Sequence, residues 1–145
     1  MQAKEFLQQL SKLDKMIENK QAEVQQWKAI ATNTVAHSEG ERVQSSGSKQ
    51  KMADAADRYI DLEREINACI DNLIDTKKDV ISVIEQLKPD EYDVIHKIYV
   101  QYFTLKETAY KCGISYTNVT TIHGRALLNV QKILDQRGKN ESNVL

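Results

Sequence analysis

Hydrophobic residues recur along the first part of the chain at alternating steps of three and four. One series runs over residues 6–31 and is broken only by Lys20, and a stronger one runs over residues 52–87 with Thr76 as its single polar member. The two series comprise Phe6, Leu10, Leu13, Ile17, Lys20, Val24, Trp27 and Ala31, then Met52, Ala55, Tyr59, Leu62, Ile66, Cys69, Leu73, Thr76, Val80, Val83 and Leu87. This spacing is typical of helices that pack along a coiled-coil seam. It predicts two long helices that fold back on each other as an antiparallel hairpin over residues 1–88.

A polar stretch rich in Ser and Gly separates the two series. Residues 38–50 lack the apolar period, and we expect a flexible connector near residues 36–51. The second predicted helix carries more apolar surface than one partner helix would cover. This extra stripe consists of Ile70, Ile74, Ile81 and Ile84. Because contiguous exposed apolar surface marks interfaces, we expect self-association through the stripe, although the C-terminal part of the chain packing back on it is the alternative.

Residues 104–122 show a different pattern, in which turn-forming and small residues stand at fixed points between apolar ones. Thr104 with Glu107 predicts a capping box at the start of a short helix. Ala109 is small where two helices would cross, and Gly113 supplies the backbone conformation that ends a helix. Ser115 then offers an N-cap for a second helix. The spacing is that of a helix-turn-helix, a motif that places its second helix in the DNA major groove.

The motif divides into a small apolar core and an outward polar face. Cys112, Ile114, Val119 and Ile122 fall at core positions. The residues expected to face DNA are Ser115, Tyr116, Thr117, Asn118, Thr120 and Thr121, with Arg125 one turn further on. An Asn side chain can bond adenine at two atoms, Thr can meet a phosphate or a thymine methyl, and Arg can bond guanine or a phosphate.

The flanking residues extend the motif into a small domain over residues 89–137, followed by a tail at 138–145. Lys88 and Pro89, followed by acidic residues, predict a helix start, and an amphipathic stretch continues the second helix to about Asp135. The segment from Pro89 to Leu134 resembles region 4 of the bacterial sigma factors. The matching residues are Leu105, Lys106, Glu107, Ala109, Gly113, Ile114, Ser115, Val119, Ile122, Arg125, Ala126 and Leu127. The outward positions here are mostly uncharged, which departs from the sigma pattern of several acidic and basic side chains.

The layout of a helical hairpin followed by such a module is similar to that of the ArpU-like and RinA-like late-transcription regulators of bacteriophages and prophages. This resemblance implies binding to double-stranded DNA, activation of late genes, and action with host RNA polymerase in the bacterial cytoplasm. An adaptor that contacts RNA polymerase or another regulator without reading bases is the main alternative. A phage packaging subunit is less favoured, because there we expect the DNA-binding module before the oligomerising helices.

Composition supports an all-α fold and adds one constraint on DNA binding. Residues 1–88 hold 13 Lys and Arg against 15 Asp and Glu, and residues 89–145 hold 7 against 6. Because phosphate neutralisation drives non-specific affinity, a monomer with so few cations should bind DNA weakly and need self-association or a partner. Cys69 and Cys112 lack a metal-type spacing and are expected to be reduced core residues. We expect no metal, no cofactor, no membrane segment and no enzymatic activity.

Overall fold

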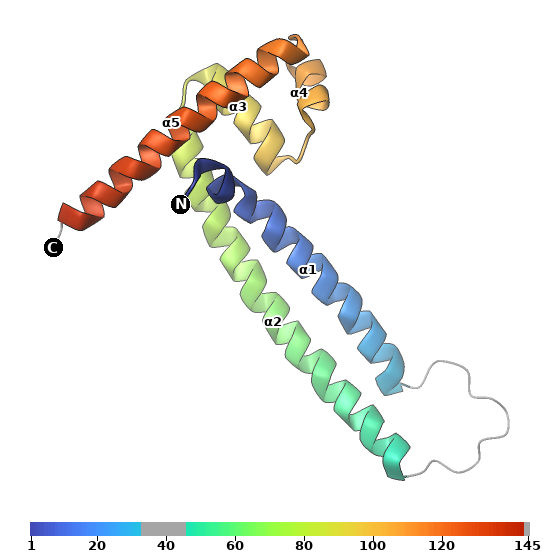
Figure 1. Cartoon of the computed structure of the whole chain (residues 1–145). Coiled ribbons are helices and arrows are strands. Elements are labelled where there is room, and N and C mark those ends of the chain that lie inside the picture. Colours follow the sequence, from blue (N-terminus) through green and yellow to red (C-terminus); the bar gives the residue numbers. More distant parts are fainter. Residues whose placement is uncertain (33–45, 144–145) are drawn as a thin grey trace. The chain divides into compact units, whose positions relative to one another are not determined.

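The computed structural model describes residues 1–32 and 46–143, and all regular structure within these ranges is helical (Figure 1). The elements are α1 (Ala3–Thr32), α2 (Ser46–Ile84), α3 (Pro89–Ile95), the π-helix η1 (His96–Val100), α4 (Leu105–Cys112) and α5 (Tyr116–Asn143). The all-α prediction is therefore confirmed. The chain divides into two compact units, one formed by Leu13–Asn72 and the other by Met1–Lys12 with Leu73–Leu145.

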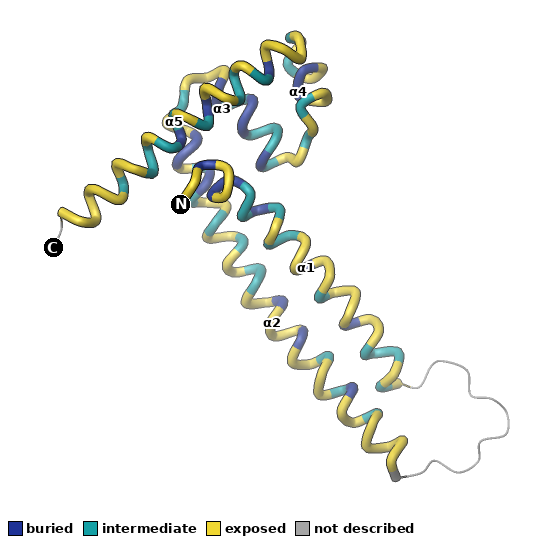
Figure 2. Tube along the Cα trace, in the orientation of Figure 1, coloured by how far each residue is buried: buried dark blue, intermediate teal, exposed yellow. Residues whose placement is uncertain are grey.

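The first unit is an antiparallel pair of helical segments from α1 and α2, which run side by side in Figure 1. Every member of the predicted seams in this unit is buried or half-buried. The fully covered positions are Ile17, Val24, Ala55, Leu62 and Ile66. Buried residues recur at intervals along both helices, with exposed residues between them (Figure 2). The predicted coiled-coil hairpin is confirmed.

The charged interruption of the first seam is accommodated by an ion pair across the hairpin. The Lys20 amine lies 2.9 Å from a Glu65 carboxylate oxygen, and this hydrogen bond raises the pKa of Lys20. A long aliphatic stem lets a lysine lie along the seam while its amine reaches the partner helix at the edge. Lys28 pairs with Glu63 in the same way at 3.2 Å.

The connector is shorter than expected at its C-terminal end. Helix α2 begins at Ser46, so residues 46–51 are helical and the prediction for them was wrong. Ser and Gly are well tolerated in the first turn of a helix, where backbone N–H groups have no intrahelical acceptor. The long apolar period that follows extends the helix back over these residues. Residues 36–45 of the predicted connector lie outside the described residues.

The larger of the hydrophobic clusters described in the second unit combines residues of α1 and α2 with residues of the C-terminal helices. Its buried members are Ala3, Phe6, Leu7 and Leu10 from α1, Val80, Val83 and Ile84 from α2, Ile95 and Tyr99 from α3 and η1, and Ala126 and Val130 from α5. The compact unit therefore does not begin at residue 89, where we expected the domain boundary. A module of about 50 residues has too little interior to bury its apolar surface alone, and the first turns of α1 supply part of that interior.

This core also corrects the predicted oligomerisation stripe. Ile84 is fully buried in this core, which α1 and the C-terminal helices share, so it offers nothing to a second copy. Ile70 and Ile81 are half-buried, and Ile74 is 47% exposed. Packing of the C-terminal part of the chain, the alternative left open by the sequence, accounts for Ile84.

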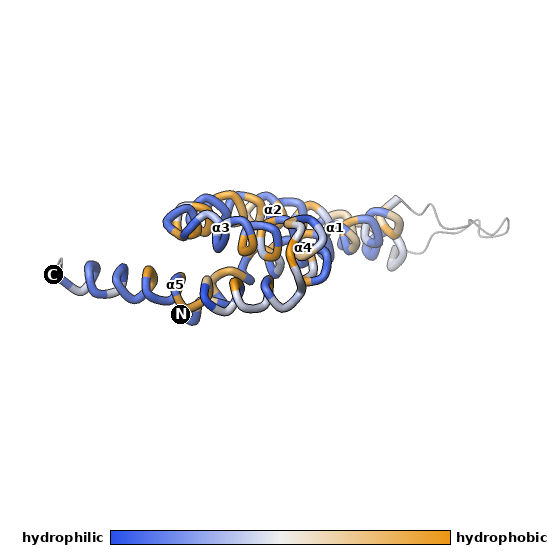
Figure 3. Tube along the Cα trace, turned by 90° about the horizontal axis from the view of Figure 1, so that it is seen from above, coloured by the Kyte–Doolittle hydropathy of each residue, from blue (hydrophilic) through white to orange (hydrophobic). Residues whose placement is uncertain are grey.

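Helix α5 extends beyond its predicted end near Asp135 and runs to Asn143. Residues 138–143, predicted as a tail, are therefore helical, and Figure 3 shows these last turns as hydrophilic. The Arg137 guanidinium binds the Asp79 carboxylate at 2.6 Å, which links this part of α5 to α2. Gly138 lies inside the helix without ending it, because its cost of about 1 kcal/mol relative to Ala is small beside the surrounding helical contacts. Within the described residues, no helix combines the length and the apolar character needed to cross a bilayer.

Candidate nucleic-acid interface

The turn between α4 and α5 has the local geometry that the sequence predicts. Thr104 accepts a hydrogen bond from the Glu107 backbone N–H at 3.1 Å, and Glu107 accepts one from the Thr104 N–H at 3.3 Å, which completes the capping box. Gly113 ends α4 in the left-handed conformation, with φ 66° and ψ 32°. Ser115 caps α5 by accepting from the Asn118 N–H at 3.1 Å. All three predictions for this turn are confirmed.

A small apolar cluster fixes the angle between the two helices. Val94 of α3, Ala109 of α4 and Val119 of α5 are its buried members, and Leu105, Ile98, Ile114 and Ile122 pack against it. The small side chain of Ala109 lets α4 approach α5 closely. Cys112, the last residue of α4, is half-buried with a free thiol, which donates to an Asp93 carboxylate oxygen at 3.4 Å. Burial and this hydrogen bond raise the pKa of the Cys112 thiol, which favours its protonated form.

The structure brings the predicted reading residues together on the N-terminal turns of α5. Ser115, Tyr116, Thr117, Asn118 and Thr121 are exposed there, and Thr120 is half-buried.

Several of the hydroxyl groups on this face are already engaged. Thr120 and Thr121 each donate to the Thr117 carbonyl, at 2.8 and 3.0 Å. Their oxygens keep only acceptor capacity, whereas the Asn118 amide and the Thr117 hydroxyl bond no other described side chain. Asn118 therefore has both its donor and its acceptor free for a base edge.

Sequence reasoning missed a second group of exposed side chains, on α4 and at its start. Tyr110 is 88% exposed, and a shallow hollow between the beginnings of α4 and α5 is lined by Thr104, Leu105, Lys106 and Tyr116. Lys106 and Tyr110 are both exposed on α4, the first helix of the helix-turn-helix, and stand one helical turn apart. The signal was present, because both are polar-ended side chains at outward positions of the first helix.

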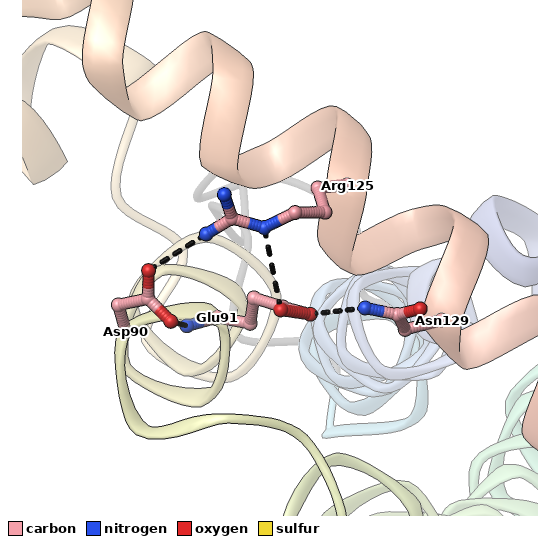
Figure 4. A network of polar contacts seen from close by, with 4 residues as sticks. All are labelled: Asp90, Glu91, Arg125 and Asn129. Carbon is pink, nitrogen blue, oxygen red and sulfur yellow. Dashed lines mark hydrogen bonds and ion pairs between the residues drawn. The ribbon is translucent and has the colours of Figure 1, made fainter.

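Arg125 has a different environment from the other predicted reading residues. Its Nη2 atom lies 2.7 Å from an Asp90 oxygen and its Nε atom lies 3.5 Å from Glu91 Oε2 (Figure 4). Glu91 is fully buried and accepts a hydrogen bond from the Asn129 amide through its other oxygen. These contacts join the start of α3 to the middle of α5, and the spacing of 35 residues between Asp90 and Arg125 gave no sequence signal.

A second contact holds α5 against η1. The Tyr99 hydroxyl and the His123 Nε2 atom are 2.8 Å apart, and the two rings are stacked with centroids 5.7 Å apart. Burial lowers the pKa of His123, and the nearby Lys4 charge lowers it further, so the imidazole is neutral at pH 7. Burial also raises the pKa of the Tyr99 hydroxyl. His123 therefore serves packing and does not add positive charge to the exposed face.

Taken together, a capped helix, a left-handed glycine turn and a second helix with an exposed polar N-terminal face define a helix-turn-helix module of the DNA-binding class. Comparison with known families agrees with this geometry: residues 83–132, about a third of the chain, match the family model for sigma-70, region 4. That family consists of DNA-binding regulatory modules that contact DNA and RNA polymerase and are not enzymes. No curated protein and no solved structure gave a match to the chain.

Proposed function

We propose that this protein is a sequence-specific DNA-binding transcriptional regulator that reads its site with the N-terminal turns of α5. The observation that carries the proposal is the free Asn118 amide, exposed at the start of the second helix of a segment that matches sigma-70, region 4. An asparagine at such a position can bond the N6 and N7 atoms of adenine together. Thr117, Thr121 and Tyr116 flank it and can contact phosphates or thymine methyl groups.

The charge of the helix-turn-helix module determines how much of its DNA affinity is electrostatic. Of its cations, Lys97, Arg125 and Arg137 are paired with carboxylates, which leaves few to neutralise phosphates. Each neutralised phosphate contributes close to one unit to the dependence of log affinity on log salt. We therefore expect a shallow salt dependence for the monomer, with hydroxyl and amide contacts supplying much of the affinity.

Selection of bound sequences from a random duplex DNA pool tests the proposal. We expect the full-length protein to enrich one motif at low and at physiological salt. The variant Asn118→Ala should lose about 1–3 kcal/mol at that motif, because the base edge it bonds would then face no partner. The matched control is Asn67→Ala, which removes an exposed asparagine of α2 far along the chain from the helix-turn-helix. Equal enrichment by both variants and the wild type would exclude Asn118 as a reader.

We further propose that the regulator is a phage-type activator of late genes that acts with host RNA polymerase. The support is the region 4 match together with the helical hairpin that precedes it, the layout of the ArpU-like and RinA-like regulators. Transcription in a purified system, with host polymerase and a template carrying the selected motif, should increase when the protein is added. A decrease would identify a repressor.

The shortage of free cations favours one other candidate, an adaptor that binds RNA polymerase or another regulator through the same module. It predicts no enriched motif at either salt concentration. It also predicts co-purification with RNA polymerase that Asn118→Ala leaves unchanged.

Self-association would compensate for weak binding by a single copy. The surface that supports it is now the pair Ile74 and Ile81 on α2, the first of which is exposed and the second half-buried. Two copies on one DNA site would double the number of contacts, and the selected motif would then show two-fold symmetry.

A further inference from the structure

Glu91 is a carboxylate that the fold has removed from water. It is fully buried, and the Asn129 amide donates to its Oε1 atom. Among the described residues its Oε2 atom is buried without a hydrogen-bond partner, and the Nε atom of the Arg125 guanidinium lies 3.5 Å from it (Figure 4). Arg125 is therefore the cation that compensates this buried charge.

The Arg125 guanidinium forms ion pairs with two carboxylates, and it hydrogen-bonds Asp90 through Nη2. Nε points to Glu91 and Nη2 points to Asp90, so two carboxylates from the start of α3 hold one arginine of α5. Removing one partner of a buried ion pair leaves an uncompensated charge and is strongly destabilising. An arginine that left Glu91 to bond a base or a phosphate would incur that cost. Moreover, two carboxylates around one guanidinium give the cluster a net negative charge, which repels phosphate.

We propose that Arg125 is a positioning residue, which holds the recognition helix α5 on α3 as the counter-ion of buried Glu91, and that it does not contact DNA. DNA reading is then left to the uncharged side chains at the start of α5, with Asn118 foremost. This inference rests on the proposed function for its DNA part. Its structural part, the coupling of Glu91 to Arg125, is independent of that function.

A double-mutant cycle separates the two roles of Arg125. In Arg125→Met the guanidinium is lost while the aliphatic length is retained, and the Glu91 charge is left without its partner. In Glu91→Gln the charge is removed while an acceptor for Asn129 is kept. The double variant Glu91→Gln with Arg125→Met has neither charge. The control is Lys132→Met, which removes an exposed cation from the same helix.

We expect Arg125→Met to lower the urea midpoint and to weaken binding to the selected DNA motif. Adding Glu91→Gln should raise the midpoint again and restore the affinity to within about threefold of the wild type, because no buried charge remains. The slope of log affinity against log salt should be the same for the wild type and the double variant.

Two results would overturn the inference. A double variant that binds as weakly as Arg125→Met, with a salt slope reduced by about 1, would show that Arg125 meets a phosphate. If Glu91→Gln changed the urea midpoint by the same amount in the wild type and in Arg125→Met, Glu91 and Arg125 would not be coupled. This second measurement needs no DNA, so it decides the structural part even if the wild type binds no duplex, a result that would refute the proposed function instead.

Discussion

The two glycines of the helix-turn-helix should respond in opposite directions to the same substitution. Gly124 lies in the middle of α5, and a methyl group added there would meet nothing within 4 Å. Gly113 also has open space around it, but its backbone is left-handed with φ 66°. Space is therefore equal at the two positions, and backbone conformation alone distinguishes them.

The expected change in the free energy of unfolding comes from helix propensity at Gly124 and from the left-handed backbone at Gly113. Ala is favoured over Gly inside a helix by about 0.8–1.0 kcal/mol, so Gly124→Ala should stabilise the fold by roughly that amount. A residue with a Cβ pays about 1–2 kcal/mol in the left-handed conformation, so Gly113→Ala should destabilise by roughly that amount. The two variants should therefore differ by about 2–3 kcal/mol, the sum of these two values.

Urea unfolding followed by far-ultraviolet circular dichroism measures both variants against the wild type. We expect the midpoint to rise for Gly124→Ala and to fall for Gly113→Ala at an unchanged dependence on urea. A lower midpoint for Gly124→Ala would refute the reasoning, because it would mean that the exposed face of α5 is not open at this point. Binding of Gly124→Ala to the selected DNA motif then shows whether the missing side chain allows DNA to approach the helix, in which case affinity falls although stability rises.

Two further predictions concern pH and assembly. Burial lowers the pKa of His96 and His123, so the unfolded state takes up protons first as pH falls through about 6.5. The free energy of unfolding should therefore be highest above that pH and decrease below it. His123→Asn should reduce the decrease in urea midpoint between about pH 7 and 5.5. If α2 mediates self-association, Ile74→Asp with Ile81→Asp should lower the mass measured by light scattering while the circular dichroism spectrum is retained, and the exposed Ser82→Asp should leave the mass unchanged. A monomeric wild type would exclude self-association.

Local signals in the sequence predicted the parts of the fold that depend on neighbouring residues. The capping box at Thr104, the left-handed turn at Gly113 and the cap at Ser115 each involve groups within three residues of one another. The apolar seams were equally visible, because burial in a helical hairpin follows the period of the helix itself. The left-handed backbone at Tyr102 was missed, because its positive φ of 64° falls on a residue type that gives no such signal.

Features that join distant segments were not predictable in this way. No local pattern pairs Glu91 with Arg125, and Arg125 was consequently assigned to the DNA-reading face. The first turns of α1 were assigned to the hairpin, since nothing in their period distinguishes contact with α2 from contact with α5. Composition was misleading at the start of α2 and at the end of α5, where a Ser-rich and a Gly-containing stretch proved to be helical.

The shared core of the second unit has a consequence for how the chain acquires its structure. The Ala3 N–H donates to the Gln131 side chain at 2.7 Å, a contact between residues 128 positions apart, and Phe6, Leu7 and Leu10 belong to the same cluster as Val130. During synthesis, these early apolar side chains leave the ribosome long before α5 exists to cover them. Contacts between residues this far apart in the sequence form slowly, because a long loop must close first. The helix-turn-helix should therefore mature only after translation has passed α5, and until then its unfinished core is a surface on which chaperones can act.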